Sequence, residues 1–427
     1  MEHFGGDSVY RICHIHSQQN KHSEQPCSHI GSGYVDYVAC HITGCHAACG
    51  FRGAKNDIHG YERLEPTQSD FSTVKSKYNI LDNRLSLKSF IAILLCLCPV
   101  IAHGASSKKT PPNGFNLLRK VLVNDSMVPY EGRQMVELSS GRHTEATITQ
   151  EIHPRYNYDY IRYVMPSRVA NRVIINEGNL HWEYDPKLHL AIRHFSERDK
   201  PAPSQIAYIL HLIKINYYLK VHPRPVNMVG RACWILEIDP KLKDRYRRVW
   251  WVDGANGFVL RRDIYNTAGE MISSSSYTSI RYHPKVKMAL FHFTPPKGTR
   301  VITKAPLRLL HNYHETVKTA PRWARIPQVL GDGFVFQSAQ YVEVKKLRSL
   351  HLQYFDGICT LSVIQVPGKF NLQSKKHDVI PVNVNGRRGV LVEKSGYRIL
   401  SWYGYDCTIS MVGEISLHSM LTMAHRI

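Results

Sequence analysis

Hydrophobic and polar residues alternate along much of the chain between residues 135 and 282. The alternation is clearest at 144–152 and 160–164, and it is typical of β-strands with one buried face. Comparable short runs occur at 135–138, 173–175, 181–184, 232–238, 249–253, 259–265 and 277–282. Turn-forming residues separate these runs, as at 254–257. The pattern predicts a large antiparallel sheet.

Two segments have a helical pattern instead. Residues 115–123 predict a short amphipathic helix, and residues 205–221 have helical length with apolar positions three and four apart. Many antiparallel strands with a few helices to one side predict an α+β fold. We expect a strongly curved antiparallel sheet, or open β-barrel, with helices over its mouth. Such a sheet can enclose an apolar cavity. A smaller α+β domain follows it.

Residues 84–104 resemble a secretory signal peptide. Arg84 and Lys88 precede an unbroken apolar run, and Ala102 and Gly104 supply small residues before Ala105. The apolar run is about 13 residues, whereas a membrane-spanning helix needs about 20. We therefore expect export to the periplasm with cleavage near Gly104/Ala105, the alternative being a buried core helix.

Residues 1–83 precede this signal, although export signals normally stand at the N-terminus. We expect this stretch to be a non-native or disordered leader, with the true start near Leu81 or Leu85. It is rich in Cys and His, which are zinc ligands. Because no C-x2-C pair is present, we expect no metal site there.

The chain has 55 Lys+Arg and 34 Asp+Glu, a formal net charge of +21. Residues 1–104 hold nine of each, so the whole excess lies beyond residue 104. This excess favours anionic partners. The export signal and the lack of a recognised binding motif argue against nucleic acid.

Two segments of the predicted sheet resemble a known family. Residues 230–240 read GRACWILEIDP, and residues 245–261 read RYRRVWWVDGANGFVLR. They are similar to a Trp-containing strand and a following hairpin in the MucB/RseB sigma-E regulatory family. The matching positions are Trp234, Pro240, Arg245, Tyr246, Trp251, Asp253 and Gly257. The resemblance implies an N-terminal domain of the lipoprotein-carrier (LolA-like) fold, and Asn256-Gly257 suits a tight hairpin.

The C-terminal part resembles the same family more specifically. Residues 354–364 (YFDGICTLSVI) and 409–416 (ISMVGEIS) match two of its motifs in order. The matching positions are Tyr354, Asp356, Gly357, Gly413 and Glu414. The expected organisation is a leader at 1–83, a signal peptide at 84–104, a LolA-like domain at 105–300, a linker at 301–325 and a MucB/RseB C-terminal domain at 326–427.

Asp356 and Glu414 could be read as a catalytic pair of carboxylates. No base, nucleophile or phosphate-binding loop accompanies them. We interpret Asp356-Gly357 as a turn between strands, Gly413 as a bulge or a site of close approach, and Glu414 as a solvated strand-end residue. We therefore predict no enzymatic activity, no cofactor and no metal.

The resemblance implies a regulator of an extracytoplasmic stress response. Such a protein binds the periplasmic part of a membrane anti-sigma factor, and its cavity senses lipopolysaccharide, phospholipid or lipoprotein acyl chains. A lipid or lipoprotein carrier is the alternative, and a homo-oligomer stays open. The candidate contacts for an anionic partner are Arg245, Arg247, Arg248, Arg261 and Arg262. The alternative is that these arginines form a solvated hairpin face that binds nothing specific.

Three cysteines follow the signal. Cys359 and Cys407 have similar strand-like flanks within one domain, so this pair is the candidate for a disulfide in an oxidising compartment. Cys233 lies beside Trp234 on a core strand, and we expect it to be a buried free thiol.

Overall fold

The computed structural model describes residues 110–140, 143–195, 200, 202–304, 309–344, 347–370, 379–394 and 397–427. The expected leader, the signal peptide and the Cys/His-rich segment lie outside these residues. Within these ranges no helix has both the length and the apolar character needed to cross a bilayer.

The first sheet contains thirteen strands in the described part of the chain. They are β1 (Tyr130–Ser140), β2 (His143–Arg155), β3 (Tyr158–Met165), β4 (Val173–Glu177), β5 (Leu180–Asp185), β6 (Leu190–Phe195), β7 (Tyr217–Val221), β8 (Val226–Met228), β9 (Arg231–Pro240), β10 (Arg247–Asp253), β11 (Val259–Tyr265), β12 (Met271–Tyr282) and β13 (Arg300–Thr303).

The strand order of this sheet is β13-β6-β5-β4-β3-β2-β1-β12-β11-β10-β9-β7, and β8 also pairs with β9. Neighbours are antiparallel except β13, which runs parallel to β6. The two end strands do not pair with each other, so the curved sheet stays open and does not close into a barrel. The α+β prediction with a large curved antiparallel sheet is confirmed.

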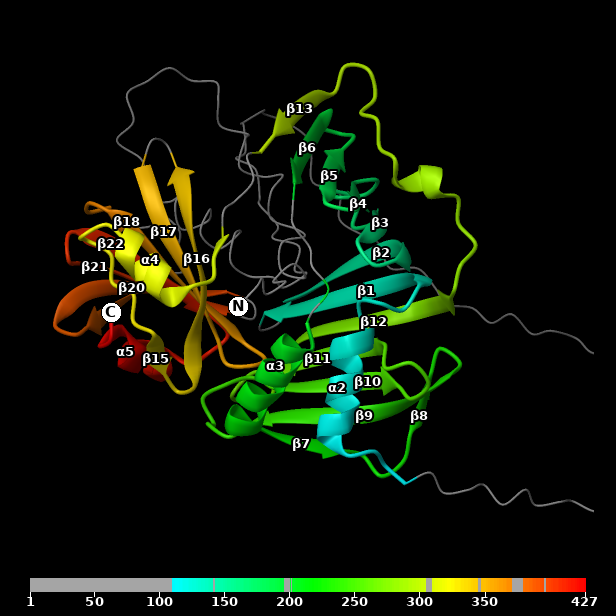
Figure 1. Ribbon diagram of the computed structural model, residues 1–427, viewed down its shortest axis with the longest axis horizontal. Helices are drawn as coiled ribbons and strands as arrows, with labels where there is room; N and C mark the ends of the chain where they lie inside the picture. The colour runs from blue at the N-terminus through cyan, green and yellow to red at the C-terminus, as the bar shows by residue number, and fades with distance from the viewer. Residues whose placement is uncertain are drawn as a thin grey trace, which may run out of the picture. The chain divides into compact units, whose positions relative to one another are not determined.

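Helices α2 (Gly114–Asn124) and α3 (Pro203–Asn216) cover one part of this sheet, over β7, β9, β10 and β11 (Figure 1). Leu118 of α2 and Ile213 of α3 are fully buried in one cluster with Leu236 of β9. Burial of such side chains contributes about 1.5–3 kcal/mol each. The predicted second helix ends earlier than expected, because residues from Tyr217 onward pair with β9 as strand β7.

The second sheet has nine strands in the described ranges. They are β14 (Leu309–Leu310), β15 (Val329–Gly331), β16 (Phe334–Val344), β17 (Leu347–Phe355), β18 (Thr360–Pro367), β19 (Val379–Val384), β20 (Arg387–Lys394), β21 (Tyr397–Gly404) and β22 (Cys407–Gly413). Their order is β14-β16-β17-β18-β22-β21-β20-β19, with β15 on β16.

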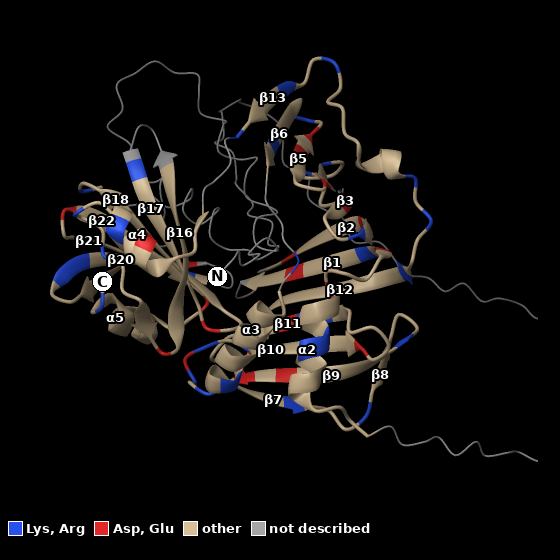
Figure 2. Ribbon diagram, in the orientation of Figure 1, with Lys and Arg blue, Asp and Glu red and all other residues tan. Residues whose placement is uncertain are grey.

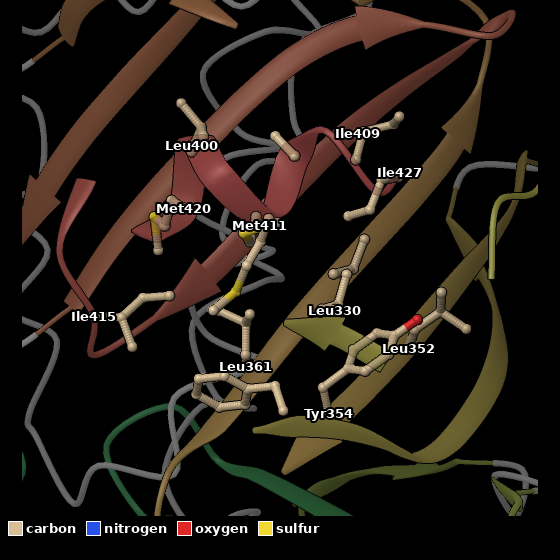
Figure 3. Packing of buried hydrophobic residues seen from close by; sticks show 14 of the residues in the cluster. Leu330, Leu352, Tyr354, Leu361, Leu400, Ile409, Met411, Ile415, Met420 and Ile427 are labelled. Carbon is tan, nitrogen blue, oxygen red and sulfur yellow. The ribbon is translucent and has the colours of Figure 1, made fainter. Parts of the chain in front are cut away.

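Helix α5 (Leu417–Ala424) packs on the second sheet. Figure 3 shows side chains of β17, β18, β21, β22 and α5 converging in this core. The expected linker at 301–325 is not a separate segment. Its first residues complete β13 of the first sheet, whereas β14 and helix α4 (Tyr313–Thr319) belong with the second.

Candidate functional site

The two sheets meet through a buried ion pair. Arg245 lies between β9 and β10, and Asp356 lies in the turn between β17 and β18. Arg245 Nη1 donates to Asp356 Oδ2 at 2.6 Å, and the side chains are 1% and 0% exposed. Burial alone would lower the pKa of Arg245, but the Asp356 carboxylate raises it. This arginine therefore keeps its charge inside the interface.

Asp356 also shapes its own turn. Its Oδ1 accepts from the backbone N–H of Ile358 (2.9 Å) and of Cys359 (2.7 Å), the geometry of an Asx turn. Its Oδ2 accepts from the hydroxyl of Tyr217 at 2.7 Å, and its backbone oxygen accepts from Asn216 Nδ2 at 2.8 Å. The predicted turn at Asp356-Gly357 is confirmed, and the end of α3 is attached to it.

A second ion pair lies beside the first. Arg248 Nη2 donates to Glu414 Oε2, and Arg248 Nη1 donates to Cys359 Sγ at 3.1 Å. Burial opposes the charge of Arg248, but the sulfur and the Glu414 carboxylate raise its pKa. We use the name interdomain cluster for the seven residues that make these contacts, which are Asn216, Tyr217, Arg245, Arg248, Asp356, Cys359 and Glu414.

The contacts of Glu414 differ from its interpretation as a solvated residue at the end of a strand. Its side chain is 16% exposed and paired with Arg248, so it is not a solvated strand-end residue. Since Asp356 and Glu414 each have an arginine partner, they do not form a shared acid–base pair. The sequence pattern gave no sign of Asn216 and Tyr217 as cluster members, because residues 205–221 were interpreted as one helix.

The other motif positions are mainly structural. Asp253 is 1% exposed and accepts from Arg231 Nε (2.8 Å) and Tyr282 Oη (3.0 Å). Gly257 has φ +84° in the β10–β11 hairpin, as its Asn-Gly sequence predicts. A Cβ on Gly413 would lie 2.6 Å from Leu361 Cδ1, so Gly413 is a site of close approach.

The remaining five motif residues lie in or beside the cores. Trp234 and Trp251 pack in two clusters of the first sheet, and Pro240 ends β9 opposite Tyr217. Tyr354 donates from its hydroxyl to Pro327 O at 2.8 Å, and Tyr246 accepts from Arg398 Nη1 at 3.3 Å.

The predicted basic surface is wrong for two of its five arginines, because Arg245 and Arg248 are 3% and 7% exposed inside the interdomain cluster. The other three are partly exposed and each faces a carboxylate. Arg261 binds Asp263 with two hydrogen bonds of 2.8 Å, Arg262 binds Asp125, and Arg247 lies 3.9 Å from Asp239. Figure 2 shows Lys and Arg scattered over both sheets among Asp and Glu.

The candidate disulfide between Cys359 and Cys407 is not formed. Both cysteines are free and buried. In the β18–β22 pair, Cys407 lies opposite Pro367 at one end, whereas Cys359 precedes Thr360 at the other end. The length of β18 separates them at about 3.3 Å per residue, and a disulfide requires Cα atoms within about 7 Å. Cys233 is a buried free thiol, as expected.

We expect all three thiols to resist alkylation in the native protein at pH 8. Burial raises the pKa of Cys359 and of Cys407 to about 11, and that of Cys233 to about 12. Almost no reactive thiolate is present at that pH. The measurement is iodoacetamide labelling followed by peptide mass spectrometry, with urea-unfolded protein as the fully labelled control. A labelled native peptide containing Cys359 would contradict the closed interface.

The described part of the chain also contains a polar pocket of about 390 Å³ on β1, β2, β3 and β12. Its lining includes Arg133, Arg162 and Arg281 together with Glu131 and Glu151. Arg162 Nη2 donates to Gln150 at 2.8 Å, and Arg281 pairs with Glu131 at 2.7 Å.

Residues 170–293, which carry β4 to β12, match the family model described as the MucB/RseB N-terminal domain. Over this segment the chain is similar to MucB/RseB N-terminal domains. The resemblance drawn from the Trp234 strand and the β10–β11 hairpin is therefore confirmed. The match ends before the second sheet, whose own motifs supply the remaining resemblance.

Known proteins with a similar sequence or structure fall into two groups. An outer-membrane lipoprotein carrier protein of Hahella chejuensis is 23% identical over 214 residues, which cover 50% of this chain and 99% of the carrier. The MucA/MucB complex structure from Pseudomonas aeruginosa matches at 13% identity and a TM-score of 0.47, covering 73% of this chain and 97% of that one. A LolA superfamily protein of Nitrosomonas europaea matches at 13% identity and a TM-score of 0.22, with 42% and 97% coverage.

Proposed function

We propose that this protein is a periplasmic regulator of an extracytoplasmic, sigma-E type stress response. It binds the periplasmic part of a membrane anti-sigma factor and does not act as an enzyme. The match of residues 170–293 to the MucB/RseB N-terminal domain model is the observation that carries this proposal. The solved MucA/MucB complex gives the kind of partner to look for.

The second sheet favours regulation over simple transport. The carrier of Hahella chejuensis is matched over almost its whole length by half of this chain, so a carrier needs only part of the chain. Here that sheet is attached to the first by two ion pairs, Arg245–Asp356 and Arg248–Glu414. A fixed arrangement of two domains offers one continuous surface to an extended partner, which lowers the entropic cost of binding.

A lipid or lipoprotein carrier is the second candidate, and the open curved sheet favours it. Antiparallel sheets that leave one concave face open are able to receive an apolar ligand. In the regulatory proposal the same face senses lipid, lipopolysaccharide or lipoprotein, so the two candidates share the ligand class and differ in the protein partner.

The test is affinity capture from the native organism. The full chain carries a C-terminal tag, mild crosslinking precedes purification, and mass spectrometry identifies bound proteins and lipids. An unrelated exported protein with the same tag is the control. Recovery of a single-pass membrane protein with a cytoplasmic sigma-binding part supports regulation. Recovery of diverse lipoproteins without such a protein rejects it and favours the carrier.

A further inference from the structure

One face of the first sheet carries a continuous row of buried polar side chains. Cross-strand register places Asp159 of β3 opposite Asn176 of β4, Asn176 opposite His181 of β5, and His181 opposite His194 of β6. Residues directly opposite each other project from the same face of a sheet. Asp159, Asn176 and His181 are 5%, 1% and 2% exposed, so their polar groups must find partners inside the protein.

Hydrogen bonds along this row fix the tautomer of His181. Asn176 Nδ2 donates to Asp159 Oδ2 at 2.6 Å, because a carboxylate only accepts. The Asn176 oxygen then faces His181 Nδ1 at 2.6 Å, so His181 carries its proton on Nδ1. The lone pair of a neutral His181 is therefore on Nε2.

His181 Nε2 faces a second acceptor. Glu183 lies two residues further along β5, on the same face, and its Oε1 is 3.4 Å from His181 Nε2. The Glu183 side chain is 1% exposed. The ring of His194 lies beside His181, with ring centroids 4.4 Å apart. One ligand atom from each of His181, Glu183 and His194 lies within 4.8 Å of the other two.

We propose that His181, Glu183 and His194 bind one divalent transition-metal ion, with Zn²⁺ as the preferred occupant. His181 Nε2 and the Glu183 carboxylate are both electron-pair donors, so they do not hydrogen-bond to each other when His181 is neutral. A cation placed between them would be bound by both. Two imidazoles and one carboxylate form a ligand set that zinc uses with a fourth position open. Asn176 then acts as the outer partner that orients a metal-binding histidine.

We expected no metal from the sequence, because no residue pair with a recognised ligand spacing such as C-x2-C was found. On a strand the matching spacing is two, as in His181 and Glu183, and the third ligand comes from the neighbouring strand. Lys304 is a competing cation, because it interacts electrostatically with Glu183. Its backbone N–H donates to Arg193 O at 2.9 Å, which places it at the end of β6.

The test uses the full chain, stripped with a chelator and then incubated with ZnCl₂. Residues 13–49 contain other Cys and His, so zinc content is compared between wild type and the variants Glu183→Gln and His194→Ala. We expect each variant to retain one zinc fewer per chain. With zinc at about 100 times its Kd, wild type should melt about 5 °C higher than the stripped protein, and the variants should not shift.

His222→Ala is the matched control. His222 Nε2 lies 2.6 Å from Glu237 Oε1, so this pair has the same chemistry without the third ligand. The His222→Ala variant should bind zinc as wild type does. Asn176→Ala should weaken zinc binding about 10–100-fold without abolishing it. Lys304→Met should bind zinc at least as tightly as wild type. Equal zinc content and equal thermal shifts in wild type, Glu183→Gln and His194→Ala overturn the proposal.

Discussion

Replacing Asp356 with asparagine should lower the free energy of unfolding by about 3–5 kcal/mol, because it leaves the buried Arg245 without its counter-charge. The substitution keeps the size of the side chain and an oxygen for the turn contacts to Ile358 and Cys359. Arg245 Nε and Nη2 have no hydrogen-bond partner in the described part of the chain. The carboxylate of Asp356 therefore supplies its main compensation. The measurement is urea unfolding followed by tryptophan fluorescence.

Asp239→Asn is the matched control for this prediction. Asp239 lies 3.9 Å from Arg247, and these side chains are 37% and 39% exposed. A solvent-exposed pair contributes about 0–1 kcal/mol, so this variant should unfold close to wild type. If both variants lose the same stability, the Arg245–Asp356 pair is not buried in solution.

Local patterns in the sequence were sufficient to predict most strands of the first sheet. Alternation identified β1, β2 and β3, and the Asn256-Gly257 pair identified the β10–β11 hairpin. Short strands such as β8 and β13 were missed because three or four residues cannot establish a period. Residues 217–221 kept an apolar helical spacing, but their backbone groups pair with β9, so a tertiary contact overrode the local pattern.

The interdomain cluster could be predicted only in part. The motifs around Arg245, Asp356 and Glu414 were recognised as belonging to one family. Their contacts were not predicted, because 111 residues separate Arg245 from Asp356 in the chain. An arginine-rich hairpin is usually solvated, and nothing local to it indicates that a second sheet covers two of its side chains. The cysteine prediction failed for the same reason, since similar flanks do not give the register of β18 and β22.

Replacing Gly357 with alanine should destabilise the protein by about 2–6 kcal/mol and loosen the contact between the sheets. Gly357 has φ +105°, a conformation that costs a residue with a side chain about 1–3 kcal/mol. A Cβ there would lie 2.7 Å from Ile213 Cγ1 and 2.8 Å from the Ile213 backbone nitrogen. Because α3 cannot yield at its backbone, the clash adds an overpacking cost of about 1–3 kcal/mol.

Gly386→Ala separates these two costs, because Gly386 has φ +79° but no atom within 4 Å of an added Cβ. The free energy of unfolding of Gly386→Ala should fall only by the conformational cost, about 1–2 kcal/mol. The difference between the two variants in urea unfolding measures the packing of the β17–β18 turn against α3. Equal losses would contradict that packing. We expect Gly357→Ala to lose more stability than Gly386→Ala, and Cys359 to become alkylated in the folded Gly357→Ala protein. Both results together would show that the closed interface keeps the cluster buried.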